Sequence, residues 1–456
     1  MRSAALIPRV ALPRRIALLT AAALLNGCAA APVSTAPTAA PVVRTSIAPI
    51  PTLLPTFTAA LALPLPIVST ATIDEPTSAP IVVLPIETRQ AIYNEVWRTV
   101  HDEYLYPDYH GIDWQGIRAS YQRKVEAAPT REAFYDVMRA LIDELNDQHS
   151  RFVPPHGAQQ EDASTSGRET EVGIGALVVP RSGGGFIQLV FPESPAARAG
   201  LLPRDRVMSV DGHPYALDDG NLQGETGSRV RLTVETPGGK LRDVVLTRQE
   251  VVEHIVPSAR RFPDDIGYIA IPTLWVNDMG EQVSGALTDL VASGSLRGLI
   301  IDLRGNRGGW GEVLSDILGH FARGQVGVFF GRKTSRPLVV GPPAGPDLRG
   351  LPLVVLVDGD TASYAEVLTA VLQHEAKAQV VGVRSAGNTE TIYGHNLSDG
   401  SRLWLAQEGF RLQNGTNLEG VGIEPDSVVD LDWTSFAEDD DPQILEALRM
   451  LGGGPK

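Results

Sequence analysis

The sequence has a single cysteine, Cys28, among its 456 residues. An internal disulfide is therefore impossible, and no group of cysteines and histidines has the spacing of a zinc site. Basic residues are also scarce, because 39 Lys and Arg stand against 54 Asp and Glu, for a net charge of −15. With no dense basic patch, this balance argues against a nucleic-acid-binding protein. We predict no metal or organic cofactor.

Long hydrophobic runs are scarce as well. The apolar segment at residues 16–25 is too short to span a bilayer comfortably, and four arginines precede it between residues 2 and 15. Residues 25–28, at the end of this segment, read LNGC and resemble the lipobox of bacterial lipoproteins, where the cysteine is lipidated. We predict a signal peptide over residues 1–28, lipidation of Cys28 and a membrane-anchored location outside the cytoplasm of a bacterium. The alternative is an unused cysteine after a plain signal peptide.

Composition divides the rest of the chain. Residues 29–86 are rich in Ala, Pro, Thr and Val, carry few charges and show no helical period. They are predicted to form a disordered or extended tether. The remaining segments are a helical domain at 87–166, a β-rich domain at 167–252, an α/β domain at 253–435 and a C-terminal tail at 436–456.

The helical domain is predicted from apolar spacing. Ile92, Val96 and Val100 recur every four residues, as on one face of a helix. Thr130 stands where an N-cap would begin another helix. Residues 159–167 are polar and are predicted to form a loop.

The β-rich segment consists of short alternating strands. Its clearest piece, residues 192–212, contains SPAARAG followed by RDRVMSVDG and resembles a PDZ domain of bacterial proteases. PDZ domains bind peptide C-termini by adding a strand to a sheet edge. The resemblance implies that Gly173, Ile174 and Gly175 receive the carboxylate. The alternative is a module that only packs against its neighbour and regulates it.

The third segment alternates strands and helices, which indicates an α/β domain with a mostly parallel sheet. Near its middle, a buried strand at 354–357 is followed by a turn, then Ser363, then a helix over 364–375. The first N–H groups of a helix are unpaired and face incoming negative charge. Taken alone, Ser363 is either a helix N-cap or a nucleophile.

A glycine-rich stretch follows another predicted strand. Residues 302–309 read DLRGNRGG, which is neither a Walker motif nor a convincing dinucleotide fingerprint. Backbone N–H groups of such a loop could instead form an oxyanion hole, which acyl transfer requires.

Together these motifs resemble the C-terminal-processing (tail-specific) proteases and their relatives of the tricorn-core type. The resemblance covers roughly residues 87–432. It implies a multidomain α+β protein with a catalytic domain of the ClpP/crotonase-like kind, a nucleophile at Ser363, and an oxyanion hole from the amides of Tyr364 and of Gly308 or Gly309. The matching stretches, in order, are DLRGNRGG (302–309), TASYAE (361–366), AKAQVVG (376–382) and GVGIEPD (420–426).

The chain departs from the processing proteases at one position. Where they carry the lysine of a Ser–Lys dyad, this sequence has Asn388, which cannot accept a proton. Lys377 matches a basic structural position before a strand instead. Tricorn-type relatives use a histidine after the helical domain and a glutamate before the GVxPD turn, and these positions are His149 and Glu419 here. The resemblance therefore implies a Ser363–His149–Glu419 arrangement.

Several alternatives remain at this stage. His395, in a Gly/Asn turn, competes with His149 as base, while His374 is predicted to lie at the surface. His149 could merely tie the helical domain to the catalytic one, and Glu419 could be a simple turn residue. We predict a serine endopeptidase acting on protein or peptide substrates. The rival is an inactive relative, a PDZ-bearing peptide-binding protein at the cell surface.

Overall fold

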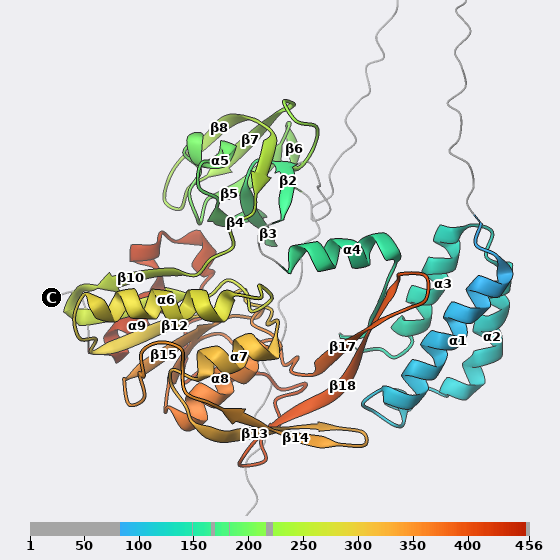
Figure 1. The fold of residues 1–456 in the computed structure, drawn as a ribbon. Coiled ribbons are helices and arrows are strands. Elements are labelled where there is room, and N and C mark those ends of the chain that lie inside the picture. Colours follow the sequence, from blue (N-terminus) through green and yellow to red (C-terminus); the bar gives the residue numbers. More distant parts are fainter. Residues whose placement is uncertain (1–82, 148, 166–168, 182, 216–221, 453–456) are drawn as a thin grey trace, which may run out of the picture. The chain divides into compact units, whose positions relative to one another are not determined.

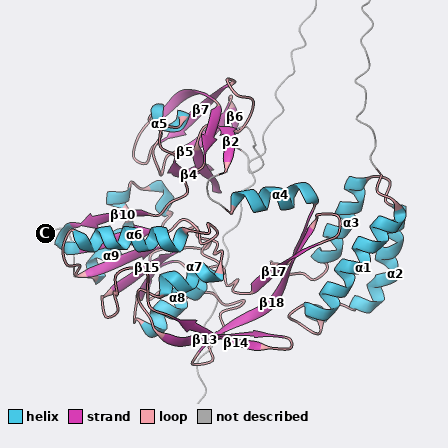
Figure 2. Cartoon of the chain, in the orientation of Figure 1, coloured by secondary structure: helices cyan, strands magenta, loops and turns pink. Residues whose placement is uncertain are grey.

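The computed structural model describes residues 83–147, 149–165, 169–181, 183–215 and 222–452 (Figure 1). The predicted signal peptide, Cys28 and nearly all of the predicted tether lie outside the described residues. Helices and strands both occur along the described chain (Figure 2). Among these helices, none combines the length and the apolar character needed to cross a membrane.

Three helices form the helical domain. On the first of them, Ile92, Val96 and Val100 are fully buried, as their spacing predicts. Trp97 stacks on Trp114 with ring centroids 4.5 Å apart, which joins the first two helices. The predicted cap of the third helix is confirmed, because the Ala133 N–H donates to Thr130 Oγ1 at 3.0 Å. The helices are α1 (Ile86–Glu103), α2 (Trp114–Ala127) and α3 (Arg131–Asp143).

The helix α4 (Pro155–Ser164) shows that the prediction of a loop at residues 159–167 was wrong for residues 159–164, while residues 166 and 167 lie outside the described residues. Proline is tolerated in the first turn of a helix, where its missing N–H would have no partner. Glu161 accepts a hydrogen bond from Trp404 Nε1 at 2.8 Å and pairs with Arg402 at 3.2 Å. These partners lie more than 200 residues away, so the polar composition of the segment could not reveal the helix.

The β-rich domain contains a sheet and a separate two-stranded ribbon. The sheet has the order β3-β4-β5-β7-β8, with β6 paired to β5, and β2 pairs with β9 in the ribbon. A short helix, α5 (Pro195–Arg198), begins after Ser194, whose hydroxyl accepts from the Ala197 N–H at 3.1 Å. The strands are β2 (Thr170–Gly173), β3 (Ala176–Arg181), β4 (Gly184–Val190), β5 (Arg206–Val210), β6 (His213–Pro214), β7 (Arg229–Glu235), β8 (Leu241–Thr247) and β9 (Gln249–Val252).

The α/β domain is built on a six-stranded sheet of order β10-β11-β12-β15-β16-β19. Neighbouring strands in this sheet run parallel, except for the antiparallel pair β10 and β11, which confirms the predicted mostly parallel sheet. Its strands are β10 (Ser258–Phe262), β11 (Ile266–Ala270), β12 (Gly298–Asp302), β15 (Leu353–Val357), β16 (Gln379–Gly382) and β19 (Ser427–Val428).

Helices cover both faces of this sheet. Side chains alternate along the strands, so Ile301 and Val355 pack with α6, α7 and α8, whereas Ile300 and Val354 pack with Ile444 of α9. The central strands are thus buried on both faces, as in other parallel sheets. The helices are α6 (Met279–Ala292), α7 (Gly311–Leu318), α8 (Tyr364–Glu375) and α9 (Pro442–Met450).

A second, antiparallel sheet connects the α/β domain to the helical domain. Its central strand β18 pairs with β13, with β17 and with β1, and β1 follows directly from the helical domain. The strands of this sheet were not predicted from the sequence. Its strands are β1 (Arg151–Val153), β13 (Gly324–Gly331), β14 (Ser335–Val340), β17 (Thr391–Asn396) and β18 (Arg402–Leu412).

The C-terminal segment is anchored by a buried ion pair. Asp441 caps α9 by accepting from the Gln443 N–H at 3.0 Å, and it also accepts from Arg304 Nη1 at 2.8 Å. Arg304 binds Asp302 at the end of β12 as well, and burial of all three side chains is nearly complete. Although burial opposes it, the Arg304 guanidinium holds the pKa of Asp302 below its usual value. The predicted multidomain α+β class is confirmed.

Candidate active site

Ser363 lies between the end of β15 and the first residue of α8. The turn before it is held by Thr361, whose buried hydroxyl donates to the Leu303 carbonyl at 2.9 Å and accepts from the Asp358 N–H at 3.0 Å. The backbone of Ser363 has φ 56° and ψ −129°, a conformation that favours glycine. Its N–H donates to the Asn388 carbonyl at 2.6 Å. The strand-to-helix turn therefore fixes the backbone of the predicted nucleophile.

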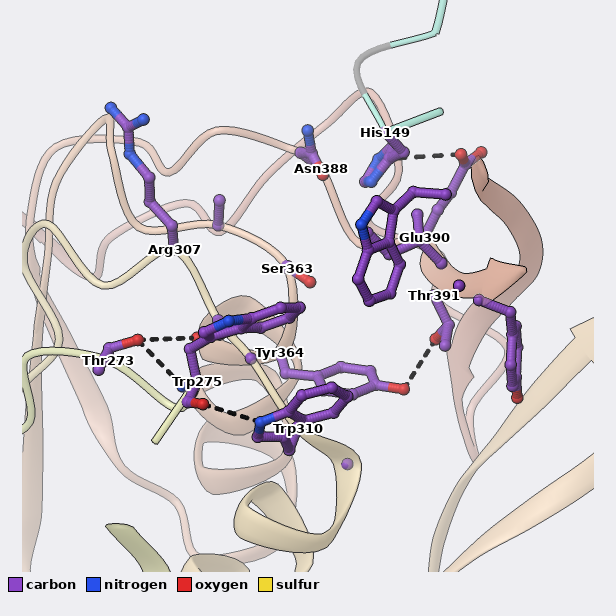
Figure 3. Close-up of a pocket in the computed structure, with 18 of the residues that line it drawn as sticks. His149, Thr273, Trp275, Arg307, Trp310, Ser363, Tyr364, Asn388, Glu390 and Thr391 are labelled. Atoms are coloured by element: carbon purple, nitrogen blue, oxygen red, sulfur yellow. Dashed lines mark hydrogen bonds and ion pairs between the residues drawn. The ribbon is translucent and has the colours of Figure 1, made fainter. Parts of the chain in front are cut away.

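Glu366, in the first turn of α8, fixes the turn that carries Asn388. Its buried carboxylate accepts from Ser385 Oγ at 2.5 Å and from the N–H groups of Gly387 and Asn388, each at 2.8 Å. Burial raises the pKa of Glu366, and these hydrogen bonds oppose that rise. The position of the family lysine is thus occupied by an asparagine on a rigid turn beside Ser363, and both residues line one pocket (Figure 3).

His149 follows α3 and is held by its neighbours in the chain. Its backbone N–H donates to Asp147 Oδ1 at 2.9 Å, and Tyr104 donates to the other oxygen of Asp147 at 2.7 Å. Ser150 Oγ accepts from the Ala406 N–H at 3.1 Å, which attaches this loop to β18. Through this attachment to the antiparallel sheet, His149 lines the same pocket as Ser363 (Figure 3).

Glu419 lies next to His149. Its Oε1 is 3.8 Å from His149 Nε2, and its Oε2 accepts from Thr389 N at 2.6 Å and Thr389 Oγ1 at 3.1 Å. Burial works to raise the pKa of Glu419, but the contacts from His149 and Thr389 outweigh it and the pKa is lowered. Glu419 is therefore ionised at neutral pH and can stabilise a protonated imidazole.

Glu390 is a second carboxylate at His149, and the sequence did not indicate it. Its Oε2 is 3.8 Å from His149 Nε2, and its Oε1 accepts a hydrogen bond from Tyr106 of the helical domain. Burial raises its pKa to about 7, which the Tyr106 hydroxyl and His149 oppose. None of the family motifs includes Glu390. The only available signal was an acidic residue two positions after Asn388, directly before the strand β17.

The glycine-rich loop lies against the start of α8. Gly308 has φ 82°, and a Cβ on it would come within 2.8 Å of the Tyr364 nitrogen. The Gly308 N–H already donates to Asn306 Oδ1 at 2.9 Å, so Gly309 is the better candidate for an oxyanion donor. Gly309 has no room for a side chain, since a Cβ would meet the Leu274 carbonyl carbon at 2.0 Å. The amides of Gly309 and Tyr364 remain the candidates for the oxyanion hole.

The competing basic residues lie elsewhere. His395 is on β17 and does not line the pocket; its ring contacts Gln407, and burial lowers its pKa. Lys377 is exposed and donates to the His374 carbonyl at 2.6 Å. His374 is only partly exposed and pairs with Glu375 at 2.9 Å. Among these groups and His149, only His149 lines the pocket of Ser363.

The pocket itself is large and partly aromatic. It has a volume of about 1610 Å³ and is lined by both charged and apolar side chains. Trp275 and Trp310 stack in it with ring centroids 4.5 Å apart (Figure 3). Trp310 Nε1 donates to the Trp275 carbonyl at 2.8 Å, which fixes the pair. A pocket of this size can take an extended segment of polypeptide rather than a single small molecule.

The predicted carboxylate loop of the PDZ-like domain lies between β2 and β3. Ile174 is buried in the domain core, and its carbonyl accepts from the Ala196 N–H at 2.8 Å. Gly175 has φ 75°, and a Cβ there would meet Ser194 Cβ at 2.3 Å. Gly173 closes the β2–β9 pairing opposite Gln249. The loop is thus packed against the start of α5, and its role in peptide binding stays a prediction.

Three family descriptions match separate parts of the chain. Residues 265–429 match "Peptidase family S41", residues 85–143 match "Tricorn protease C1 domain" and residues 186–236 match "PDZ domain". The order of the three agrees with the order of motifs along the sequence.

Relatives match over most of the chain. The carboxyl-terminal-processing protease of Synechocystis sp. is 28% identical over 387 residues, which cover 81% of this chain and 88% of the relative. The chloroplastic C-terminal processing peptidase of Tetradesmus obliquus is 28% identical over 367 residues, which cover 76% of this chain and 78% of the relative. The solved structure of a photosystem II D1 C-terminal processing protease has a TM-score of 0.54 at 24% identity, covering 80% of this chain and 98% of that one, and it supports the fold.

The fold, the strand–turn–helix position of Ser363 and these matches agree with one another. The chain is a serine-type peptidase, and its segment 265–429 matches peptidase family S41.

Proposed function

We propose that the protein is a membrane-tethered, extracytoplasmic serine endopeptidase that uses Ser363 as nucleophile, His149 as general base and Glu419 as the supporting carboxylate. Two observations carry this proposal: His149 lines the same pocket as Ser363, and its Nε2 lies 3.8 Å from Glu419 Oε1. The position of Asn388 in place of the family lysine favours a histidine base.

The reaction follows from these positions. His149 takes the proton of the Ser363 hydroxyl as its oxygen attacks the scissile carbonyl carbon. The N–H groups of Gly309 and Tyr364 stabilise the negative oxygen of the tetrahedral intermediate. His149 then gives the proton to the leaving amine, and an acyl-enzyme remains on Ser363. Water activated by the same histidine releases the acid, while Glu419 stabilises the imidazolium. The proposed steps use no cofactor.

A fluorophosphonate probe, which reacts with activated serines, tests these roles. We expect labelling of the wild type, none of Ser363→Ala, and a rate at least about 100-fold lower for His149→Ala. Glu419→Gln should lower the rate by a smaller factor. The matched control is His395→Ala, a histidine outside the pocket, which should label at the wild-type rate. Full labelling of His149→Ala would refute the histidine mechanism.

The alternative function is an inactive, PDZ-bearing peptide-binding protein, because Asn388 removes the expected base. The same probe separates the two. A folded wild type that reacts no faster than Ser363→Ala would favour the binding protein.

We infer that substrates are proteins or peptides bound through their C-termini or an extended segment. The relatives are named for carboxyl-terminal processing. Residues 186–236 match a PDZ domain, and in such a domain the loop Gly173–Gly175 would receive the carboxylate. Cleavage of one peptide with a free and with an amidated C-terminus tests this. Equal rates would exclude recognition of the carboxylate.

The membrane anchor is proposed from Cys28 and the LNGC sequence around it. In fractionated bacterial cells the wild type should sediment with membranes, whereas Cys28→Ser should not. Sedimentation of both proteins would contradict a lipid anchor at this residue.

A further inference from the structure

His149, Glu390 and Glu419 form a compact cluster of potential metal ligands. One ligand atom from each residue lies within 4.8 Å of the other two. Both carboxylate contacts to His149 Nε2 are 3.8 Å long. The three residues come from separate parts of the chain: the loop after α3, the stretch before β17 and the turn before β19.

Two atoms of this cluster are buried without a hydrogen-bond partner. They are His149 Nε2 and Glu390 Oε2, on side chains that are 7% and 2% exposed. A buried polar atom without a partner costs about 1–3 kcal/mol, so such atoms are rare in folded proteins. Here the two unsatisfied atoms face each other, which points to a ligand that would bind both.

We propose that His149 Nε2, Glu390 Oε2 and Glu419 Oε1 bind a Zn²⁺ ion. Zinc is bound by imidazole nitrogen and carboxylate oxygen, and three protein ligands leave a fourth position open. With bonds of about 2.0–2.1 Å, ligand atoms around a tetrahedral zinc are about 3.3 Å apart. The contacts of 3.8 Å need only a small movement of the side chains. The charge of Zn²⁺ would also compensate the two neighbouring carboxylates.

Neighbouring groups already orient the two carboxylates for this role. Tyr106 holds Glu390 by Oε1 and leaves Oε2 toward His149. Thr389 holds Glu419 by Oε2 and leaves Oε1 toward His149. Metal ligands in proteins are commonly fixed by a second set of hydrogen bonds in this way.

Zinc at this position would inhibit the peptidase, a consequence that rests on the proposed function. An imidazole whose Nε2 lone pair is bound to zinc carries its remaining proton on Nδ1. It therefore has no lone pair left to take the proton of Ser363. The metal-free protein is the active form, and free Zn²⁺ outside the cytoplasm would switch it off.

Zinc binding can be measured without catalysis. We would titrate Zn²⁺ into the metal-free, full-length Cys28→Ser, Ser363→Ala protein by calorimetry, because these changes remove the only thiol and the nucleophile. We expect one ion per chain, with affinity at least tenfold lower in Glu390→Gln and in Glu419→Gln. The matched control is His374→Ala, which removes a partly exposed histidine that is paired with Glu375 and lies outside the cluster. Thermal unfolding without metal checks that each variant is folded.

The outcomes are distinct. No binding, unchanged affinity in Glu390→Gln, or loss of the ion in His374→Ala would each overturn the zinc site. In a second arm, Zn²⁺ should slow fluorophosphonate labelling of the Cys28→Ser protein, and a chelator should restore it. Zinc that binds at the site without slowing a protein that does label would overturn the inhibitory role. If no labelling occurs at all, the peptidase proposal fails while the calorimetry still decides the metal site.

Discussion

Ser363 has a backbone conformation that glycine adopts more easily than serine, with φ 56° and ψ −129°. Such conformations cost about 1–3 kcal/mol for a residue with a Cβ. We expect Ser363→Gly to have a free energy of unfolding about 1 kcal/mol higher than Ser363→Ala, since glycine relieves the strain but orders a more flexible unfolded chain. Urea unfolding of the two variants measures this difference. Both lack the hydroxyl, so equal stabilities would mean that the turn is not strained.

The residues of the candidate site differed in how far the sequence could predict them. Ser363, His149 and Glu419 were predicted because each falls in a motif of the resembled family, and the structure brings His149 and Glu419 together. Their catalytic roles stay predictions. Glu390 could not be found, because its importance comes from contacts with Tyr106 and His149, which are 284 residues and more than 200 residues away in the chain. Only the folded arrangement creates that carboxylate pair.

Among the elements, the β2–β9 ribbon has three acidic residues at one end: Glu171 on β2, and Glu169 and Glu253 directly beside the two strands. Burial first, and then the charges of Glu171 and Glu169, raise the pKa of Glu253 to about 7. Its ionised form is thus disfavoured in the folded state, so the contribution of Glu253 to stability is greatest at low pH and is lost as the pH rises from about 4.5 through 7. We expect Glu253→Gln to raise Tm relative to the wild type at pH 8, with little difference at pH 4.5.

Thermal unfolding of both proteins at the two pH values checks this expectation. Glu250→Gln, on the strand β9 that directly precedes Glu253, is the matched control and should change Tm by the same amount at both pH values. A Glu253→Gln effect that did not depend on pH would contradict the raised pKa.

Elements were predictable where local pattern decided them. The helix α8 begins and ends at the predicted residues 364 and 375, because its apolar period and its flanking turns define it. By contrast, α4 forms on contacts with distant Arg402 and Trp404, and most of the antiparallel sheet around β18 depends on pairing between remote segments. Such pairings carry no local signal.

At the scale of the whole molecule, Arg304 links the glycine-rich loop to the C-terminal helix through Asp302 and Asp441. All three groups are buried, so removing the guanidinium leaves the Asp302 carboxylate without its cationic partner and Asp441 with only Arg204. We expect Arg304→Leu to lower the free energy of unfolding by about 3–5 kcal/mol, measured by denaturant unfolding. Arg349→Leu is the matched control, since Arg349 also binds an aspartate two residues before it, Asp347, but at the surface. Arg349→Leu should change the free energy of unfolding little. An equal decrease in both variants would contradict the importance of burial.

His149 reaches the pocket from outside the peptidase segment. It lies between the stretch matched to the tricorn C1 domain, which ends at residue 143, and the S41 stretch, which begins at residue 265. A gene fusion or a recombinant fragment that preserved only residues 265–429 would keep Ser363 and Glu419 but not the proposed base. On this mechanism the three catalytic residues do not lie within one contiguous domain. Recombination that separated the two segments would remove the proposed base, so we expect active relatives with this mechanism to retain both the helical domain and the peptidase domain.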